Sequence, residues 1–227
     1  MKLIVLVGFS KGLGKAIFDQ LRKGLKPGKV ELLALGRNTK DFPKYDAVAY
    51  QEADLLKDDC WESLSERIPS NTELLDVFIN ASVIEPIAVV GSLNSYQLES
   101  AVTVNYVSPM KLVNQLASLQ KKNKFTMNIF NITSGASTRP IEGWALYCST
   151  KAAFKMFLDV THKESEGTIS VTHIDPGVVD TDMQKTIRSK SNKEMKNVQQ
   201  FRDLNLSNNL KSPQDAARDV LAYSGIR

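Results

Sequence analysis

The chain has 227 residues, of which 42% are hydrophobic and 24% are charged, and this is the composition of an ordinary globular protein rather than a disordered one. Its 29 basic and 25 acidic residues give a net charge of +4, which is too small to indicate a nucleic-acid partner. Two cysteines and two histidines exclude a disulfide framework and argue against a structural zinc site, so we expect no metal.

The sequence also argues against a membrane protein. No apolar run reaches the roughly 18 residues that a spanning helix requires. The opening segment 1–7 briefly resembles a signal peptide, but it lacks a small-residue cleavage site and runs into a glycine cluster, so we interpret it as a buried strand. Together with reduced cysteines, this predicts a cytoplasmic protein.

Short apolar runs rich in β-branched residues alternate with longer amphipathic segments, and runs of this kind are typical of strands covered on both faces. The expected strands are residues 3–7, 30–35, 47–50, 74–79, 125–132 and 169–174. The expected helices are residues 12–25, 58–68, 95–121 and 145–165. This alternation predicts an α/β fold, a Rossmann-type doubly wound parallel sheet with helices on both faces, in a single domain over residues 1–227.

A glycine-rich turn follows the first expected strand, in the order Gly8-Phe9-Ser10-Lys11-Gly12-Leu13-Gly14. Glycine permits a sharp turn and close approach to a pyrophosphate, and the following helix offers free N–H groups. Lys15 suggests a P-loop, but leucine at position 13 and alanine at position 16 do not fit that motif. The context favours a dinucleotide site, and the alternative is an ordinary turn.

The end of the second strand favours NADP(H). Sites for NAD usually place an acidic residue there, whereas Arg37 and Asn38 stand at this point and Lys11 adds a second cation. The planar guanidinium suits a 2′-phosphate. The alternative is that Arg37 is a solvated loop residue.

Tyr147 and Lys151 are four residues apart on an expected helix and therefore share a face. A nearby ammonium stabilises phenolate, so we expect a tyrosine pKa lowered from about 10 toward the working range and a general acid–base at Tyr147. Ser134 follows the strand 125–132, at the edge where open α/β sheets bind ligands. It could donate to a carbonyl oxygen, or it could merely open a turn.

Asn105 falls on the apolar face of the expected helix 95–121, and Pro109 lies four residues later. Proline has no N–H, so the carbonyl of Asn105 loses its usual helical partner. Our hypothesis is that this carbonyl holds a water that connects Lys151 to solvent as a proton relay. A simple proline kink is the alternative.

Together these motifs resemble the short-chain dehydrogenase/reductase family over nearly the whole chain. The matching pieces are the glycine turn, Asp54-Leu55, Asn80-Ala81-Ser82, Asn105, Ser134, Tyr147 with Lys151, and the run 176–181. The stretches 134–148 and 176–183 are similar to a branch that contains sepiapterin reductases and benzil reductases.

The resemblance implies an NADPH-dependent carbonyl reductase. In that family Tyr147 would protonate the carbonyl oxygen as hydride arrives, Lys151 would bind the nicotinamide ribose, Ser134 would hold the substrate oxygen, and Asn105 would maintain the relay. The implied cofactor contacts are Asp54 and Leu55 at the adenine, Asn80 and Ala81 near its ribose, and Pro176, Gly177, Val179 and Thr181 near the carboxamide. A homodimer or homotetramer through the helices 95–121 and 145–165 is also implied.

Three departures from the family pattern stand out. Val7 replaces the usual threonine that braces the turn, and Ser82 replaces a glycine, so a small side chain must fit near the adenosine. The chain ends at Arg227, about where the family has a seventh strand.

The family places a substrate flap at residues 177–213, and its Lys-, Asn- and Gln-rich part 183–203 reads as an exposed, mobile helical segment. The expected substrate contacts are Ser134, Trp144 and Met183, although Trp144 could equally belong to the core. The flap cations could attract an anion or form a solvated face. We expect a hydrophobic ketone or 1,2-dicarbonyl as substrate, with a pterin side-chain ketone as the second choice. The rival interpretation is a non-catalytic NADP(H)-binding sensor or scaffold.

Overall fold

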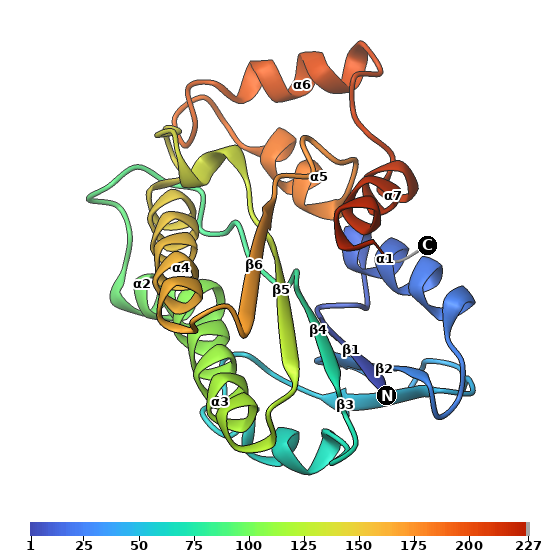
Figure 1. Ribbon diagram of the computed structural model, residues 1–227. Coiled ribbons are helices and arrows are strands. Elements are labelled where there is room, and N and C mark those ends of the chain that lie inside the picture. Colours follow the sequence, from blue (N-terminus) through green and yellow to red (C-terminus); the bar gives the residue numbers. More distant parts are fainter. Residues whose placement is uncertain (226–227) are drawn as a thin grey trace.

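A parallel sheet runs through the middle of the molecule (Figure 1). The computed structural model describes residues 1–225. Its strands follow the order β3-β2-β1-β4-β5-β6, and every neighbouring pair is parallel. They are β1 (Lys2–Val7), β2 (Val30–Gly36), β3 (Val48–Glu52), β4 (Leu74–Ile79), β5 (Thr126–Ile132) and β6 (Ile169–Ile174). This order is that of the Rossmann-type doubly wound sheet, and it confirms the predicted fold class.

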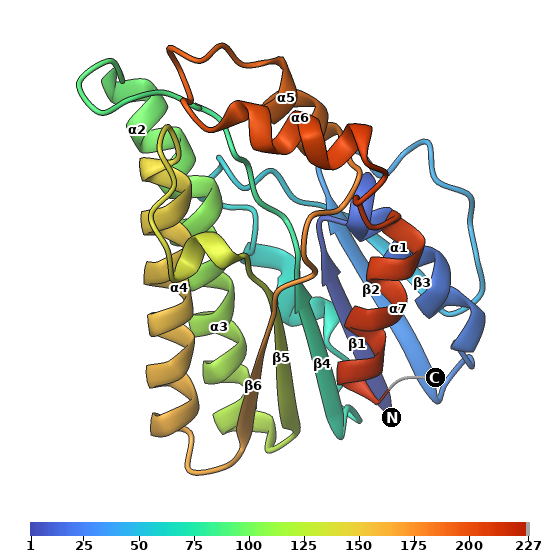
Figure 2. The same ribbon diagram turned by 90° about the horizontal axis from the view of Figure 1, so that it is seen from above.

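Helices cover both faces of the sheet. Figure 2 shows α1 and α7 on one face and α3 and α4 on the other, so the molecule has three layers. The helices other than α5 (Asp182–Ser189) and α6 (Val198–Leu206) are α1 (Gly12–Leu21), α2 (Ser95–Val102), α3 (Ser108–Asn123), α4 (Ala145–Glu164) and α7 (Pro213–Ser224). The first turn of α7 is fixed by its sequence, because the Ser212 hydroxyl accepts from the Asp215 N–H and proline stands at the first helical position.

The sheet is buried on both faces, which explains its continuous apolar runs. Leu112, Leu116 and Phe154 pack against one face from α3 and α4. Ile17 and Val220 pack against the other from α1 and α7. Each of these five side chains is almost completely buried, so the strands are held rigidly and their carboxyl ends form a fixed edge.

Two expected helices differ in detail from the prediction. The predicted helix at 58–68 is confirmed in part, because the segment forms a shorter 3₁₀ helix at Glu62–Arg67. The buried side chains of Trp61 and Leu64 lie three apart, which matches the three-residue repeat of that helix. The expected helix 95–121 is present, but a π-helical turn at Thr103–Val107 separates α2 from α3.

The helices α5 (Asp182–Ser189) and α6 (Val198–Leu206) lie over the carboxyl edge of the sheet (Figure 2). The predicted helical character of 183–203 is therefore confirmed, but the segment is not exposed throughout. Met195 and Val198 are fully buried, in a cluster that includes Trp144 and Ile187.

Most of the cationic side chains in the flap form ion pairs or donate to backbone carbonyls. Lys190 Nζ lies 3.7 Å from a Glu85 oxygen and 3.5 Å from a Glu194 oxygen. Arg202 donates to the carbonyls of Arg188 and Lys190. Lys190 thus links the flap to Glu85 outside it, and Arg202 links α6 to the end of α5 within it. The expectations of an anion site or of a solvated face stay untested.

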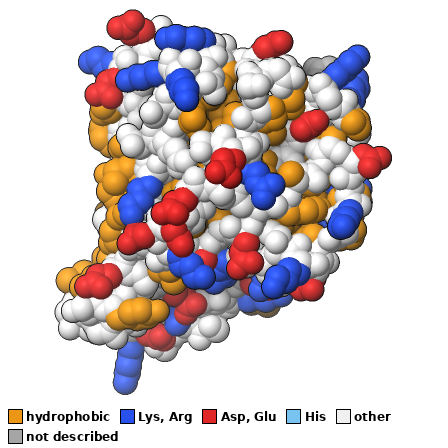
Figure 3. Space-filling model, turned by 90° about the horizontal axis from the view of Figure 1, so that it is seen from below, with side chains coloured by type: hydrophobic (Ala, Val, Ile, Leu, Met, Phe, Trp, Pro, Cys, Tyr) orange, Lys and Arg blue, Asp and Glu red, His pale blue; other side chains and the backbone are white. Residues whose placement is uncertain are grey.

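No helix within residues 1–225 is long and apolar enough to cross a bilayer. The same residues contain no group of three or more potential metal ligands. On the face in Figure 3, basic and acidic side chains are interspersed, so that face carries no patch of one sign. The seventh strand that the family resemblance implies lies outside the described residues.

Candidate active site

A cavity of about 790 Å³ opens between α5 and the carboxyl ends of the strands, within the roughly 300–1,000 Å³ of small-molecule sites. Most residues predicted for the site line it. They are Gly8, Ser10, Lys11, Gly12, Leu13, Arg37, Asp54, Leu55, Asn80, Ala81, Ser134, Trp144, Tyr147, Lys151, Pro176, Gly177, Val179, Thr181 and Met183. The fold thus brings together side chains that lie far apart in the sequence.

Gly14, Asn38 and Asn105 were predicted for the site, but they lie outside the cavity lining. Gly14 lies beneath the turn, and a Cβ there would be 1.8 Å from the carbonyl oxygen of Gly8. The amide of Asn38 donates to Asp41 at 2.8 Å. Gly14 packs against Gly8 and Asn80, which line the cavity, and Asn105 bonds to Val83 of the lining, as described below.

The glycine turn after β1 is held in place by residues that follow β4, a neighbouring strand in the sheet. Gly8 has a φ of +85° and packs so closely on Ala81 that a Cβ would lie 2.7 Å away, so this position favours glycine. The amide of Asn80 donates to the Gly8 carbonyl at 2.8 Å. Asn80 therefore supplies a brace to the turn where Val7 lacks a hydroxyl.

The amino end of α1 offers free donors to the cavity. The helix begins at Gly12, directly after Lys11, and no side chain caps it. Its first N–H groups have no partner within the helix, and the helix dipole adds positive charge there. Arg37 lies exposed at the cavity after β2. This end of the cavity can therefore hold an anionic group.

Tyr147 and Lys151 lie at the other end, both almost fully buried on α4. The Lys151 ammonium donates to the Ile132 carbonyl at 2.9 Å and lies 5.7 Å from the centre of the Tyr147 ring. Burial lowers the pKa of Lys151 from 10.5 to about 8. The side chain is thus poised between charged and neutral forms near physiological pH.

The prediction of a lowered tyrosine pKa is wrong for the protein without ligand. Burial raises the pKa of Tyr147 from 10.0 to about 12, and hydrogen bonds with the hydroxyls of Ser82 and Ser134 only partly oppose this rise. The phenol is therefore protonated at neutral pH, which is the form that a general acid requires.

Asn105 positions the loop after β4. It is 4% exposed, and its amide forms a two-sided clamp on Val83: Oδ1 accepts from the Val83 N–H and Nδ2 donates to the Val83 carbonyl, each at 2.8 Å. Asn105 lies in the π-helical turn Thr103–Val107, which precedes Pro109. The proton relay through its carbonyl stays a prediction.

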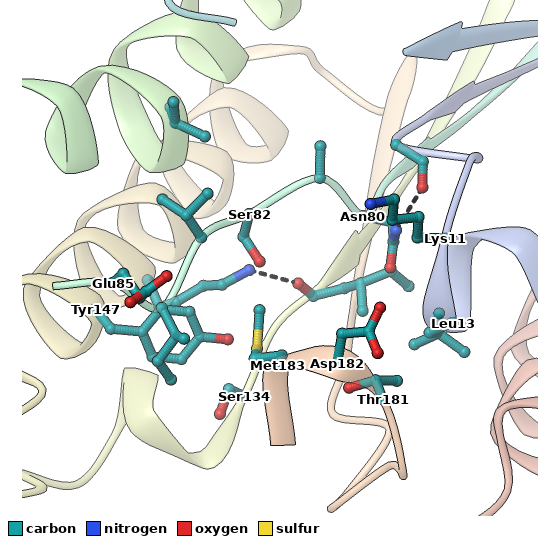
Figure 4. Close-up of a pocket in the computed structure, with 18 of the residues that line it drawn as sticks. Lys11, Leu13, Asn80, Ser82, Glu85, Ser134, Tyr147, Thr181, Asp182 and Met183 are labelled. Carbon is teal, nitrogen blue, oxygen red and sulfur yellow. Dashed lines mark hydrogen bonds between the residues drawn. The ribbon is translucent and has the colours of Figure 1, made fainter. Parts of the chain in front are cut away.

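Ser82 lines the same cavity as Tyr147 (Figure 4). Sequence reasoning noted it only as a departure from the family pattern, and the expectation that its side chain fits near the adenosine stays a prediction. Its place three residues after β4 could have indicated the sheet edge.

Several apolar side chains line the cavity around Trp144. Trp144 is 5% exposed, packs edge-on against Tyr147 with ring centres 5.7 Å apart, and contacts Phe201 of α6. Sequence reasoning did not assign Ile84, Tyr96 or Ile141, which also line the cavity. No spacing within one element marks them, because they come from separate loops and helices.

Comparison with known proteins decides the family. The family model described as short chain dehydrogenase matches residues 2–192. The chain belongs to the short-chain dehydrogenase family. This confirms the resemblance, and the family consists of oxidoreductases that bind NAD(P).

Two relatives match the predicted branch. The Bacillus subtilis (strain 168) benzil reductase ((S)-benzoin forming) is 32% identical, over 98% of this chain and 93% of the relative. The mouse (Mus musculus) sepiapterin reductase is 28% identical, over 82% and 78%. A crystal structure of the KRED1-Pglu enzyme has a TM-score of 0.84 and 29% identity, and the match covers 96% of this chain and 92% of that one.

The buried ammonium predicts a gain in stability when Lys151 is removed. The folded protein releases this proton near pH 8, whereas the unfolded chain keeps it to about pH 10.5, so the unfolded state binds more protons between these values and stability rises with pH. Lys151→Met should raise the free energy of unfolding at pH 7 by up to about 3 kcal/mol, and the gain should shrink above pH 8.

Urea unfolding at several pH values measures this difference. Lys163→Met is the matched control, because Lys163 is exposed on the same helix and should show no such pH-dependent gain. A stability difference for Lys151→Met that does not change between pH 7 and pH 10 would contradict the assignment.

Proposed function

We propose that the protein is an NADPH-dependent carbonyl reductase in which Tyr147 is the general acid. The observation that carries the proposal is the buried phenol of Tyr147, with the Lys151 ammonium 5.7 Å from its ring centre, in the same cavity as Ser134 and the glycine turn. A catalytic acid within reach of a dinucleotide site is the arrangement that carbonyl reduction requires.

The residues present fit a dinucleotide phosphate. The close approach of Gly14 to Gly8 leaves no room for side chains beneath the turn, and the uncapped start of α1 supplies donors for a pyrophosphate. Lys11 and Arg37 would hold a 2′-phosphate at the end of β2. A solved structure of a short-chain dehydrogenase from Burkholderia cenocepacia J2315 is a complex with NADP. At 18% identity, its similarity to this chain supports the fold and does not indicate the cofactor.

The remaining cofactor contacts follow from the residues that line the same cavity. Asp54 and Leu55 would contact the adenine, and Val179 and Thr181 the carboxamide. Lys151 would hold the nicotinamide ribose. When bound, NADPH supplies a hydride to the carbonyl carbon.

In the proposed reaction, the chain supplies the proton. Ser134 orients the carbonyl oxygen, and the Tyr147 hydroxyl donates its proton to that oxygen as the carbon is reduced. The product is an alcohol, and the tyrosine is left as phenolate. Lys151 and the Asn105 region would return a proton from solvent.

The proposed substrate is a hydrophobic ketone or 1,2-dicarbonyl. Apolar side chains of Trp144, Met183 and Phe201, from three different segments, line the cavity near Tyr147, and the segment 177–213 would act as the substrate flap. The similarity to a benzil reductase and to a sepiapterin reductase supports a diketone first and a pterin ketone second. Trp144 is too buried to offer more than an edge to the substrate.

The proposal also includes a homodimer or homotetramer in the cytoplasm. Met156 is 63% exposed and Val160 45% exposed, four residues apart on α4. An apolar pair on one helix face is well placed to be covered by a second copy of the chain.

Replacement of Tyr147 by Phe tests the acid–base assignment. The variant keeps the ring but has no proton to donate, so turnover of a diketone panel should fall by about 10²–10⁴-fold or more. NADPH affinity, measured by fluorescence, should stay close to the parent value. Tyr223→Phe is the control, because Tyr223 is exposed on α7. Turnover at the parent rate in Tyr147→Phe would refute the assignment, and NADPH binding without consumption of any carbonyl by the parent would favour the sensor function.

Replacement of Arg37 by Asp tests the cofactor preference. Loss of a charge-assisted phosphate contact and gain of a carboxylate for the ribose hydroxyl should shift the NADPH/NADH ratio of kcat/KM toward NADH by roughly ten- to a hundredfold. Arg67→Asp makes the same charge change at an exposed site on the 3₁₀ helix. An equal ratio in the parent and in Arg37→Asp would exclude the phosphate contact.

A further inference from the structure

Arg139 is anchored beside the two residues of the proposed reaction. It lines the cavity together with Ser134, Gly135 and Tyr147. Its N–H donates to the Gly135 carbonyl at 3.2 Å, and the Cys148 thiol donates to the Arg139 carbonyl at 3.7 Å. Gly135 directly follows Ser134, and Cys148 directly follows Tyr147. The backbone of Arg139 is therefore tied to a chain neighbour of each reacting residue.

The guanidinium of Arg139 lies where a side chain of Gly135 would stand. The three nearest neighbours of a Cβ at Gly135 would all belong to it, with Nη2 at 2.6 Å, Nε at 3.1 Å and Cζ at 3.2 Å. Gly135 does not have a positive φ, so its backbone conformation does not require glycine. The missing side chain instead gives the guanidinium room, and bond lengths then place Nη2 no more than about 8 Å from the Cα of Ser134.

The charge of Arg139 is not neutralised by any residue within 1–225. The side chain is exposed, and its guanidinium forms no ion pair and no hydrogen bond with the described residues. The acidic side chains that line the cavity have other partners: Asp54 accepts from the Leu56 N–H, Glu85 pairs with Lys190, Asp175 accepts from the Gly177 N–H, and Asp182 pairs with Lys185. The guanidinium is thus available to an anionic ligand.

A cation next to apolar side chains defines the chemistry of such a ligand. Trp144 and Phe201 line the same cavity, and the ring centre of Trp144 lies 5.7 Å from that of Tyr147. An apolar ligand body fits these rings. The planar fork of an arginine binds a carboxylate through two parallel hydrogen bonds. Because the guanidinium lies so close to Ser134, the carboxylate has to be near the carbonyl that Ser134 would hold.

We propose that Arg139 is a specificity-determining residue that binds the carboxylate of a hydrophobic 2-oxo acid. The inference rests on the proposed function and narrows its 1,2-dicarbonyl substrate to the acid. The carbonyl carbon accepts a hydride from NADPH, which is oxidised to NADP⁺, and the carbonyl oxygen accepts the proton of Tyr147. The product is a 2-hydroxy acid, and the carboxylate on Arg139 is unchanged.

Benzoylformate and its methyl ester test this role as a matched pair of substrates. They share the phenyl ring and both carbonyl groups, but only benzoylformate is charged. With NADPH, the parent should reduce benzoylformate with a kcat/KM no lower than that for the ester. Arg139→Gln should lower kcat/KM for benzoylformate by roughly ten- to a hundredfold, the effect of losing a charge-assisted contact, and leave the value for the ester nearly unchanged.

Two further variants separate the fork of Arg139 from its charge and from general effects. Arg139→Lys keeps the charge without the two-pronged geometry, so its kcat/KM for benzoylformate should lie between those of the parent and Arg139→Gln. Arg67→Gln makes the same substitution at an exposed site on the 3₁₀ helix and should keep the parent ratio. An equal loss for acid and ester in Arg139→Gln would overturn the proposed role.

A binding measurement does not depend on turnover. Phenylacetate has the ring and the carboxylate but no ketone to reduce. Its Kd for the complex of the enzyme with NADPH, measured by titration calorimetry, should rise about tenfold in Arg139→Gln. In Arg67→Gln the Kd should equal that of the parent. An equal Kd in the parent and in Arg139→Gln would contradict a carboxylate contact at Arg139.

The outcomes separate this inference from the proposed function. If the parent reduces diketones or the ester but discriminates against benzoylformate, the role of Arg139 is wrong and the reductase stands. If the parent reduces none of these carbonyls, the proposed function fails, and the phenylacetate titration still decides whether Arg139 holds a carboxylate.

Discussion

The bond from the Lys151 ammonium to the Ile132 carbonyl joins α4 to the end of β5 at 2.9 Å. It places a charged group inside the protein, where water cannot solvate it, and a carbonyl oxygen partly replaces that water. Because Tyr147 lies one turn earlier on the same helix, this contact also sets the position of the phenol. Helix, strand and acid–base pair are therefore fixed as one unit.

This unit explains the opposite shifts in the two side chains. Burial disfavours charge in both, so it raises the pKa of Tyr147 and lowers that of Lys151. The neutral phenol is suited to give a proton, and the lysine can exchange one near neutral pH. Burial of the Lys151 ammonium lowers the stability of the folded protein, as groups at functional sites commonly do.

Much of this arrangement could be predicted from the sequence. The strands were predictable because a parallel sheet buried on both faces requires unbroken apolar runs such as 3–7. The positions of Tyr147 and Ser134 followed from helix spacing and from the strand end. The 3₁₀ helix after Trp61 was not predictable, because a short apolar pair fits either helix type.

The anchoring of the loop after β4 and the pKa of Tyr147 could not be predicted for a different reason. A residue that follows a strand is known to lie at the sheet edge, but its loop is held there by bonds with residues distant in the sequence, here from Asn80 to Gly8 and from Val83 to Asn105. The sequence shows a lysine near a tyrosine, which lowers the tyrosine pKa. It does not show how deeply both are buried, and burial has the larger effect.

Lys190 joins the segment after α5 to the loop after β4 through Glu85, while the same ammonium also reaches Glu194. Glu85 is 63% exposed in its side chain, so dissolved ions screen its attraction to the ammonium far more than they weaken the buried core. Ionic strength should therefore govern how readily small molecules enter and leave beneath α5, while the thermal stability of the sheet stays nearly constant.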